Sequence, residues 1–379
     1  MTARTTIYRN ASVFTGAADA PPQESFAVRD GRILAAGDLT PVRLAAGADS
    51  VEVDLGGAFV SPGIIEGHAH MLMLGESLDK VQLRDCTSVA EVQERLAAAR
   101  AAAPDAPRIL GTSWLFDIFA PGERPTAAML DAAVPDVPVI LDANDLHSVW
   151  VNTAALQAME IDRSTPDPVG GEIMRDDEGD ATGFLLETAA MKHAWGYLEA
   201  MASDADRDRF LENACNAYLE TGVTGATEMS FGAADLAAYR RRLDRDGRLP
   251  FPVNAHWILT ASGSLETDLA EVAEVARLRD EVAAQCGEDW LRIAGVKFIL
   301  DGVIDACTAT MRAPYANGAL PGPIWEREFA LPVAVAADAA GLQLALHAIG
   351  DEASTIALDM VQECISVNGP RADRRARVE

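Results

Sequence analysis

The residues with the clearest chemistry are His68 and His70, which end a short apolar stretch broken by Pro62-Gly63. In a strand, residues i and i+2 point to the same face, so both imidazoles can face one point, as a metal ion requires. Two ligands are too few for a metal site, and the alternative is a chance pair of histidines at the end of a buried strand. The metal interpretation therefore depends on further ligands.

Lys297 is a second candidate because it lies in an apolar segment of a chain that contains only three lysines. A lone lysine in such a strand is costly to desolvate. On the inward face it could add CO2 and become a carbamate, a carboxylate that can bridge two metal ions. The alternative is a lysine that extends its amine to solvent or pairs with an acid such as Asp301.

Two further histidines complete the candidate set. His347 ends the apolar segment 342–347, at the end of a strand where barrel enzymes place their active sites. A core histidine is the alternative for this residue. His147 follows the segment 138–143 and could hold a substrate oxygen, or it could be a surface-loop histidine.

The segments that carry these residues alternate between strand and helix. From residue 204 onwards, strands are predicted at 225–229, 251–259, 291–300 and 342–347, and helices at 204–220, 265–286 and 331–340. This rhythm is typical of βα units on a parallel sheet. Residues 1–60 instead predict short strands with a hairpin at Asp30-Gly31. Residues 75–203 are mixed, with a helix from Ser88 to about Ala103, strands at 108–114 and 138–143, and a hairpin at 170–183.

The lengths of these segments predict an incomplete barrel. If His70 ends strand 1 and Lys297 lies on strand 4, about 90 residues should separate them, but the chain has more than twice that number. The surplus predicts an insertion over 75–203. Strand 5 ends at His347, and the residues after it are too few for three more units, which need about 90.

Composition excludes several classes of function. The net charge of −27 argues against nucleic acid or an anionic membrane as a partner. No apolar stretch approaches the roughly 18 residues of a membrane span. Five widely spaced cysteines without a C-x-x-C pair predict reduced thiols in a cytoplasmic protein. Nucleophile-elbow, P-loop and dinucleotide-binding motifs are absent from the sequence. A homodimer is left open.

Taken together, the motifs resemble the amidohydrolase superfamily, in particular its YtcJ-like branch (amidohydrolase 3). The resemblance covers most of the chain. It rests on Ser61-Pro62-Gly63 with His68-Ala69-His70, on Gly170-Gly171-Glu172-Ile173 running on to Thr182-Gly183-Phe184-Leu185-Leu186-Glu187, on Gly222-Val223-Thr224, on Val296-Lys297-Phe298 with Asp301-Gly302, and on His347-Ala348-Ile349-Gly350-Asp351. These motifs are specific jointly and not singly.

The resemblance implies an α/β fold: a TIM-type (β/α)8 barrel, here incomplete, with a small N-terminal β-sandwich unit and a large insertion after barrel strand 1. The expected division is 1–60 for the β unit, 61–74 for the first strand, 75–203 for the insertion and 204–379 for barrel strands 2–5. The implied activity is hydrolysis of a non-peptide C–N bond in a small molecule by metal-activated water.

The resemblance also implies roles for the candidate residues. His68 and His70 would bind the first metal ion, Lys297 would bridge as a carbamate, and His347 would bind the second of one or two ions, expected to be Zn2+. Lys297 and His347 are the expected catalytic residues. His147, Trp114 and Asp301 are the expected substrate contacts.

The chain departs from the family pattern in two places. Glu66 stands where the motif usually has Asp. The superfamily also takes a histidine from strand 6, and an aspartate from strand 8 that binds metal and acts as the general base. Because the chain ends about where that histidine is expected, we expect strands 6–8 to be missing and the product to be truncated and weakly active. The alternative is an inactive half-barrel that binds a ligand or partner.

Overall fold

The computed structural model describes residues 4–17, 19–168, 170–287, 289–304 and 307–379. The chain forms two compact units. One comprises residues up to 65 together with 222–224, and the other comprises 66–221 and 225–379. All candidate site residues belong to the second unit.

The first unit is a four-stranded sheet with one helix packed on it. The strands have the order β3-β2-β1-β4, where β1 is Thr6–Val13, β2 Ser25–Arg29, β3 Arg32–Gly37 and β4 Val51–Val60. The predicted hairpin is confirmed, because β2 and β3 pair antiparallel and Asp30 and Gly31 both have the positive φ of a type I′ turn. The predicted sandwich is not confirmed, since the buried residues of helix α1 (Leu39–Ala46) supply the other half of the core.

The candidate site belongs to a six-stranded sheet in the second unit, with the order β16-β15-β14-β13-β12-β5. Its strands are β5 (Ile64–Ala69), β12 (Val223–Phe231), β13 (Val253–Ile258), β14 (Leu291–Ile299), β15 (Gln343–His347) and β16 (Arg377–Val378). The neighbours from β12 to β16 pair in parallel. This is the curled parallel sheet of a half-barrel, and it confirms the predicted βα rhythm.

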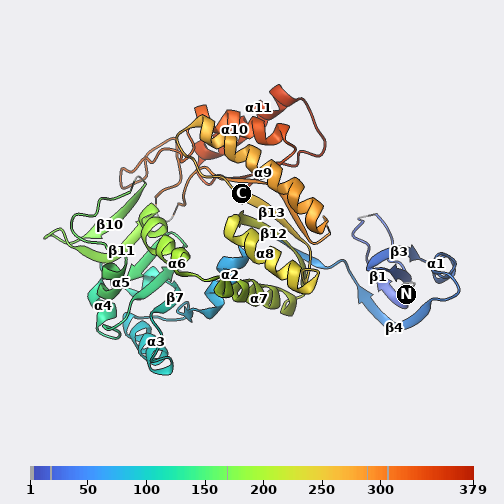
Figure 1. Ribbon diagram of the computed structural model, residues 1–379, viewed down its shortest axis with the longest axis horizontal. Coiled ribbons are helices and arrows are strands. Elements are labelled where there is room, and N and C mark those ends of the chain that lie inside the picture. Colours follow the sequence, from blue (N-terminus) through green and yellow to red (C-terminus); the bar gives the residue numbers. More distant parts are fainter. Residues whose placement is uncertain (1–3, 18, 169, 288, 305–306) are drawn as a thin grey trace. The chain divides into compact units, whose positions relative to one another are not determined.

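Helices connect these strands, as Figure 1 shows for the stretch from β12 to α11. They are α2 (Met71–Asp79), α7 (Asp204–Glu220), α8 (Ala233–Asp246), α9 (Leu265–Cys286), α10 (Arg327–Ala339) and α11 (Asp351–Asn368). Their apolar faces and the strands form the largest core cluster, which includes Phe231, Phe251, Phe298 and Trp325. The parallel sheet is thus held by burial of apolar surface against its helices.

The sheet has one strand more than the sequence predicted. Residues 377–378 form β16, which pairs in parallel with β15 through Ala345 with Arg377 and Leu346 with Val378. The outer edge of β15 is therefore paired with the short strand β16. Two residues carry no readable period, so the sequence could not reveal this strand.

The residues between α2 and α7 form a second six-stranded sheet, in the order β10-β11-β9-β8-β7-β6. Its strands are β6 (Val81–Gln82), β7 (Ile109–Trp114), β8 (Val139–Ala143), β9 (Ser148–Val151), β10 (Gly171–Arg175) and β11 (Ala181–Glu187). The predicted hairpin at 170–183 is confirmed as the antiparallel pair β10–β11.

Short helices accompany this second sheet. They are α3 (Val89–Ala102), the 3-10 turn η1 (Phe116–Ile118), α4 (Ala127–Asp131), α5 (Thr153–Ala158), the π-helix η2 (Ala190–Trp195) and α6 (Gly196–Met201). Helix α3 begins as predicted, with the Ser88 hydroxyl accepting a hydrogen bond from the Glu91 N–H at 3.3 Å.

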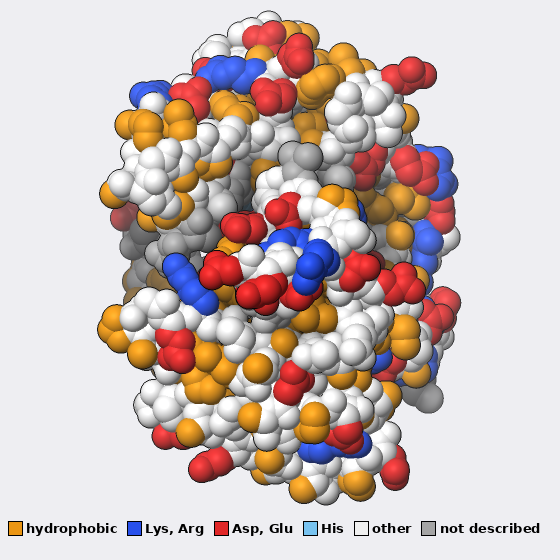
Figure 2. Space-filling model, turned by 90° about the vertical axis from the view of Figure 1, so that its left-hand side faces the viewer, with side chains coloured by type: hydrophobic (Ala, Val, Ile, Leu, Met, Phe, Trp, Pro, Cys, Tyr) orange, Lys and Arg blue, Asp and Glu red, His pale blue; other side chains and the backbone are white. Residues whose placement is uncertain are grey.

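The surface is strongly acidic, in keeping with the net charge of −27. Figure 2 shows Asp and Glu side chains spread over one face and interspersed with basic and apolar ones. Among the described residues, no helix is both long enough and apolar enough to cross a membrane.

Candidate functional site

His68 and His70 lie on opposite sides of Ala69 at the end of β5, and their rings contact each other. The ring centroids are 5.1 Å apart and the planes are inclined by 75°. His68 belongs to the strand, whereas His70 is already the residue that precedes helix α2. The two imidazoles lie together, as expected from their spacing, at the point where the strand passes into the helix.

Lys297 on β14 is buried, and its amine pairs with the carboxylate of Glu379. The other oxygen of Glu379 lies 3.3 Å from Nδ1 of His68 and 3.0 Å from the Arg377 guanidinium. The acid that neutralises Lys297 is thus Glu379 and not Asp301. Glu379 connects the lysine with the histidine pair.

The position of Glu379 follows from strand pairing. Its N–H donates to the Leu346 carbonyl at 2.9 Å, and its own carbonyl accepts from the Ala348 N–H at 2.9 Å. The register of β16 on β15 therefore places Glu379 beside His347. Glu379 was not among the predicted site residues because β16 is too short to be recognised in the sequence. Parallel pairing of β16 with β15 aligns Glu379 with His347.

The local environment makes the candidate ligands less basic than free side chains. Burial lowers the pKa of Lys297, and the hydrogen bond and charge of Glu379 offset this only in part. Burial also lowers the pKa of His68, against the opposing charge of Glu379 and with the help of Lys297 and His70. Neutral imidazoles and a neutral amine are the forms that bind a metal ion or add CO2.

Glu228 on β12 fixes the turn from β5 into α2. Its carboxylate is buried and accepts the Met71 N–H at 2.6 Å and the Ser230 N–H at 2.9 Å. One of its oxygens also lies 3.8 Å from Nδ1 of His70. Glu228 was not among the predicted site residues, and its only signal in the sequence is that it is the one charged residue of this strand.

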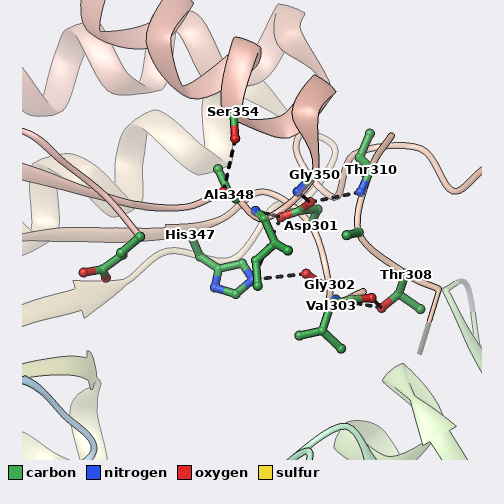
Figure 3. A network of polar contacts seen from close by, with 12 residues as sticks. Asp301, Gly302, Val303, Thr308, Thr310, His347, Ala348, Gly350 and Ser354 are labelled. Carbon is green, nitrogen blue, oxygen red and sulfur yellow. Dashed lines mark hydrogen bonds and ion pairs between the residues drawn. The ribbon is translucent and has the colours of Figure 1, made fainter. Parts of the chain in front are cut away.

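Asp301 organises the loop that carries His347, as Figure 3 shows. Its buried carboxylate accepts three backbone N–H groups, those of Thr310 at 2.9 Å, Ile349 at 3.0 Å and Gly350 at 2.7 Å. Both oxygens are therefore engaged by the protein, which makes Asp301 a positioning residue rather than the predicted substrate contact.

His347 itself faces the same loop. Its Nε2 lies 3.3 Å from the Gly302 carbonyl and 3.9 Å from an Asp301 oxygen (Figure 3). Burial lowers the pKa of His347, and the Gly302 carbonyl opposes the shift. The ring is thus neutral and held by one backbone carbonyl, a form that can accept a metal ion or donate to a ligand.

His147 and Trp114 differ in what they can offer. His147 sits between β8 and β9, and its Nδ1 lies 2.8 Å from a Glu187 oxygen. Trp114 is fully buried among aromatic rings and donates its indole N–H to the Leu141 carbonyl at 3.0 Å. A fully buried ring has no surface for a substrate, so Trp114 serves the core of the second sheet and not the predicted contact.

The donor atoms have the chemistry of a metal site, but they are not closed around one point. Nδ1 of His70 is buried and has no hydrogen-bond partner among the described residues, as a nitrogen reserved for another ligand would be. Within the same described part of the chain, no group of three or more His, Cys, Asp or Glu side chains converges closely enough to hold an ion. Imidazoles, a lysine and a carboxylate nevertheless form a donor set that zinc accepts.

Comparison with known families adds evidence independent of this geometry. Residues 51–379 match the amidohydrolase family. The Arabidopsis thaliana protein LONG AFTER FAR-RED 3 is 32% identical over 381 residues, an alignment that covers 98% of this chain and 63% of that protein. N-substituted formamide deformylase of Arthrobacter pascens is 29% identical over 367 residues, covering 92% of this chain and 64% of the enzyme.

A solved structure has the same fold. The crystal structure of an uncharacterized metal-dependent hydrolase from Pyrococcus furiosus superposes with a TM-score of 0.70 at 28% identity, covering 95% of this chain and 70% of that one. The chain therefore spans less than two thirds of the two curated relatives named above and somewhat more of this hydrolase.

Proposed function

The chain belongs to the amidohydrolase family, and on this premise we propose that it is a metal-dependent hydrolase that cleaves a non-peptide C–N bond in a small amide. The observation that carries the proposal is the meeting of His68, His70 and Lys297 at one edge of the parallel sheet, through Glu379. Active sites of barrel enzymes lie at the carboxyl ends of their strands, which is where these residues are.

In this proposal His68 and His70 would hold the first metal ion, and His347 would hold a second one if two are bound. The metal is Zn2+, which would lower the pKa of a bound water and polarise the scissile carbonyl. Lys297, carboxylated to a carbamate, would supply a further carboxylate ligand. Burial lowers the pKa of the Lys297 amine, which supports this role because only the neutral amine adds CO2, with release of a proton.

The protein's own residues prepare the site in three ways. Burial keeps His68 and His347 neutral and able to act as ligands. Glu228 fixes the turn that carries His70, and Asp301 fixes the loop that carries His347. Glu379 neutralises the charge of Lys297 in the buried site.

The proposed substrate is a small amide with an N-substituent. The relative that deformylates N-substituted formamides supports this class, because its name describes cleavage of a C–N bond next to a carbonyl. We include His147 among the substrate contacts of this proposal, whereas the burial of Trp114 and Asp301 argues against a contact from either of them. A cytoplasmic location is part of the proposal, supported by five free cysteines in the described chain.

The test is metal-dependent amine release by the chain. Protein stripped with a chelator and protein reloaded with Zn2+ are incubated with N-alkylformamides and N-acetylated amines, and the released amine is quantified. We expect release only after reloading, and its loss in His68→Ala but not in His193→Ala. Equal release by stripped and reloaded protein, or none by reloaded protein, would contradict the proposal.

A further inference from the structure

His147 and Glu187 are joined twice although 40 residues separate them in sequence. Ser148 on β9 pairs with Leu186 on β11, so the next residues outward are His147 and Glu187. The Glu187 N–H donates to the His147 carbonyl at 2.8 Å, and the Glu187 carboxylate lies 2.8 Å from Nδ1 of His147. The cross-strand register thus holds an imidazole against a carboxylate.

The second oxygen of Glu187 contacts the loop that follows β14. The Thr308 hydroxyl lies 3.1 Å from that oxygen and accepts the Val303 N–H at 2.9 Å. Gly302, next in this loop, presents its carbonyl to His347 (Figure 3). A chain of contacts therefore leads from His147 to His347, and it links the second sheet to the proposed site.

Residues with positive φ occur within this network or next to it in sequence. Eight non-glycine residues of the described chain have positive φ, and three of them are Leu146 (58°), Glu187 (51°) and Cys307 (59°). Leu146 precedes His147, and Cys307 precedes Thr308. Such strain is typical of functional sites, because it persists only where the surroundings hold the residue in place.

The arrangement determines which nitrogen of His147 is free. A carboxylate at Nδ1 fixes the tautomer and holds a proton there, which leaves Nε2 as the atom that can serve a ligand. Burial of the ring disfavours its charged form, but the hydrogen bond and charge of Glu187 and the charge of Asp145 outweigh this and raise the pKa of His147. His347 also interacts with His147, because the charge of His147 contributes to lowering the pKa of His347.

We propose that His147 is a catalytic residue that donates a proton from Nε2 to the departing nitrogen, and that Glu187 is the positioning residue that fixes it. As the C–N bond breaks, its electron pair passes to nitrogen and the Nε2 proton moves to the same atom. His147 is left neutral, with its Nδ1 proton still hydrogen-bonded to Glu187. The water that forms the new C–O bond to the carbonyl carbon loses a proton, and this proton restores Nε2 of His147. This inference rests on the proposed C–N hydrolysis.

The dyad can be tested without turnover by NMR titration of protein labelled at its six histidines. The signal of His147 is assigned by its absence in His147→Asn. In Glu187→Gln we expect the titration midpoint of His147 to fall by about one pH unit or more, because burial remains while the charge is lost. Glu172→Gln removes a charge from an exposed position of the same hairpin and should leave the midpoint unchanged. An unchanged midpoint in Glu187→Gln overturns the role of Glu187.

The proton-donor role is tested with amides that differ in their leaving amine. An alkylamine needs a proton to leave, whereas p-nitroaniline does not. His147→Asn keeps a donor near the Nδ1 position but lacks Nε2, so it should reduce kcat/KM about 100-fold for the alkylamide and only a few-fold for the anilide. A purely structural role of His147 would reduce kcat/KM equally for the alkylamide and the anilide, and that result would overturn the proposal.

The two proposals can fail separately. If metal-loaded wild type hydrolyses neither amide, the proposed function fails, and the proton-donor role fails with it. If wild type is active and His147→Asn and Glu187→Gln match it on both amides with unchanged thermal unfolding, only the dyad is wrong.

Discussion

At the scale of single residues, the site depends on which carboxylate each basic group contacts. Lys297 and His68 share Glu379, His147 faces Glu187, and His70 lies beside Glu228. Glu379 and Glu228 lie outside the sequence motifs, and only Glu187 belongs to one, as its last residue. The acidic partners therefore come from elements that are distant in the sequence, and they influence the protonation of the lysine and histidines that the motifs contain.

Asp301 is the residue whose role the structure changes most, and its removal should be costly. Asp301→Ala leaves three N–H groups without an acceptor in a buried loop, so we expect a loss of about 3 kcal/mol of unfolding free energy. Asp301→Asn should lose less, because the amide oxygen still accepts. Urea unfolding measures both, and a loss below about 1 kcal/mol for Asp301→Ala would contradict the role.

Residue-level prediction from sequence succeeded where local geometry decides. The two-residue period of a strand predicted that His68 and His70 would lie together, and they do. It failed where the partner comes from a distant element, as for Glu379 beside Lys297. Trp114 was misjudged because exposure depends on packing against Trp150 and Phe184, which no local pattern reveals.

At the scale of elements, close packing between helices α2 and α7 holds the start of α2, and with it His70. Gly75 lies where the two helices meet, and a Cβ at this position would be 1.7 Å from the Phe210 carbonyl oxygen. The backbone of α7 cannot yield without moving the helix. Glycine at 75 thus sets the helix separation that positions the histidine pair.

Gly75→Ala should separate α2 from α7 and destabilise the chain by about 3 kcal/mol, the upper range for overpacking. Gly322→Ala is the matched control, because its Cβ would meet nothing within 4 Å. Thermal unfolding of both variants measures the difference. Equal stability of the two variants would show that the helices adjust without cost.

Helix α8 carries a half-buried acid, Asp235, that should make stability depend on pH. Burial and the charge of Glu228 raise the pKa of Asp235 to about 7, against the Gly232 N–H that donates to it. The folded chain then holds a proton that the unfolded chain has released, so this residue's contribution to stability falls as the pH rises from about 4 to 7.

Asp235→Asn should therefore gain stability relative to wild type at pH 8 but not at pH 4, by on the order of 2 kcal/mol. The amide still accepts from Gly232 in either state. Urea unfolding at the two pH values provides the measurement. A difference between variant and wild type that does not change with pH would mean that Asp235 is ionised throughout.

At the scale of the whole molecule, the fold was predictable as far as its rhythm is regular. Strand and helix alternate from residue 204 onwards, and β12 to β15 were located from apolar runs. The second sheet was not predictable as a unit, because its strands mix parallel neighbours such as β7–β8 with antiparallel ones such as β8–β9. Pairing order there is decided by tertiary contacts and not by period.

Metal binding is the central claim at this scale, because it requires ligands from three strands: the histidine pair at the end of β5, Lys297 on β14 and His347 on β15. The direct measurement is the zinc content of the purified chain after loading and gel filtration, compared with His68→Ala/His70→Ala and with His193→Ala as a matched control. We expect about one or two ions per chain in wild type and control, and loss of at least one in the double variant with its fold retained. No bound zinc in wild type, or an undiminished content in the double variant, would contradict the account.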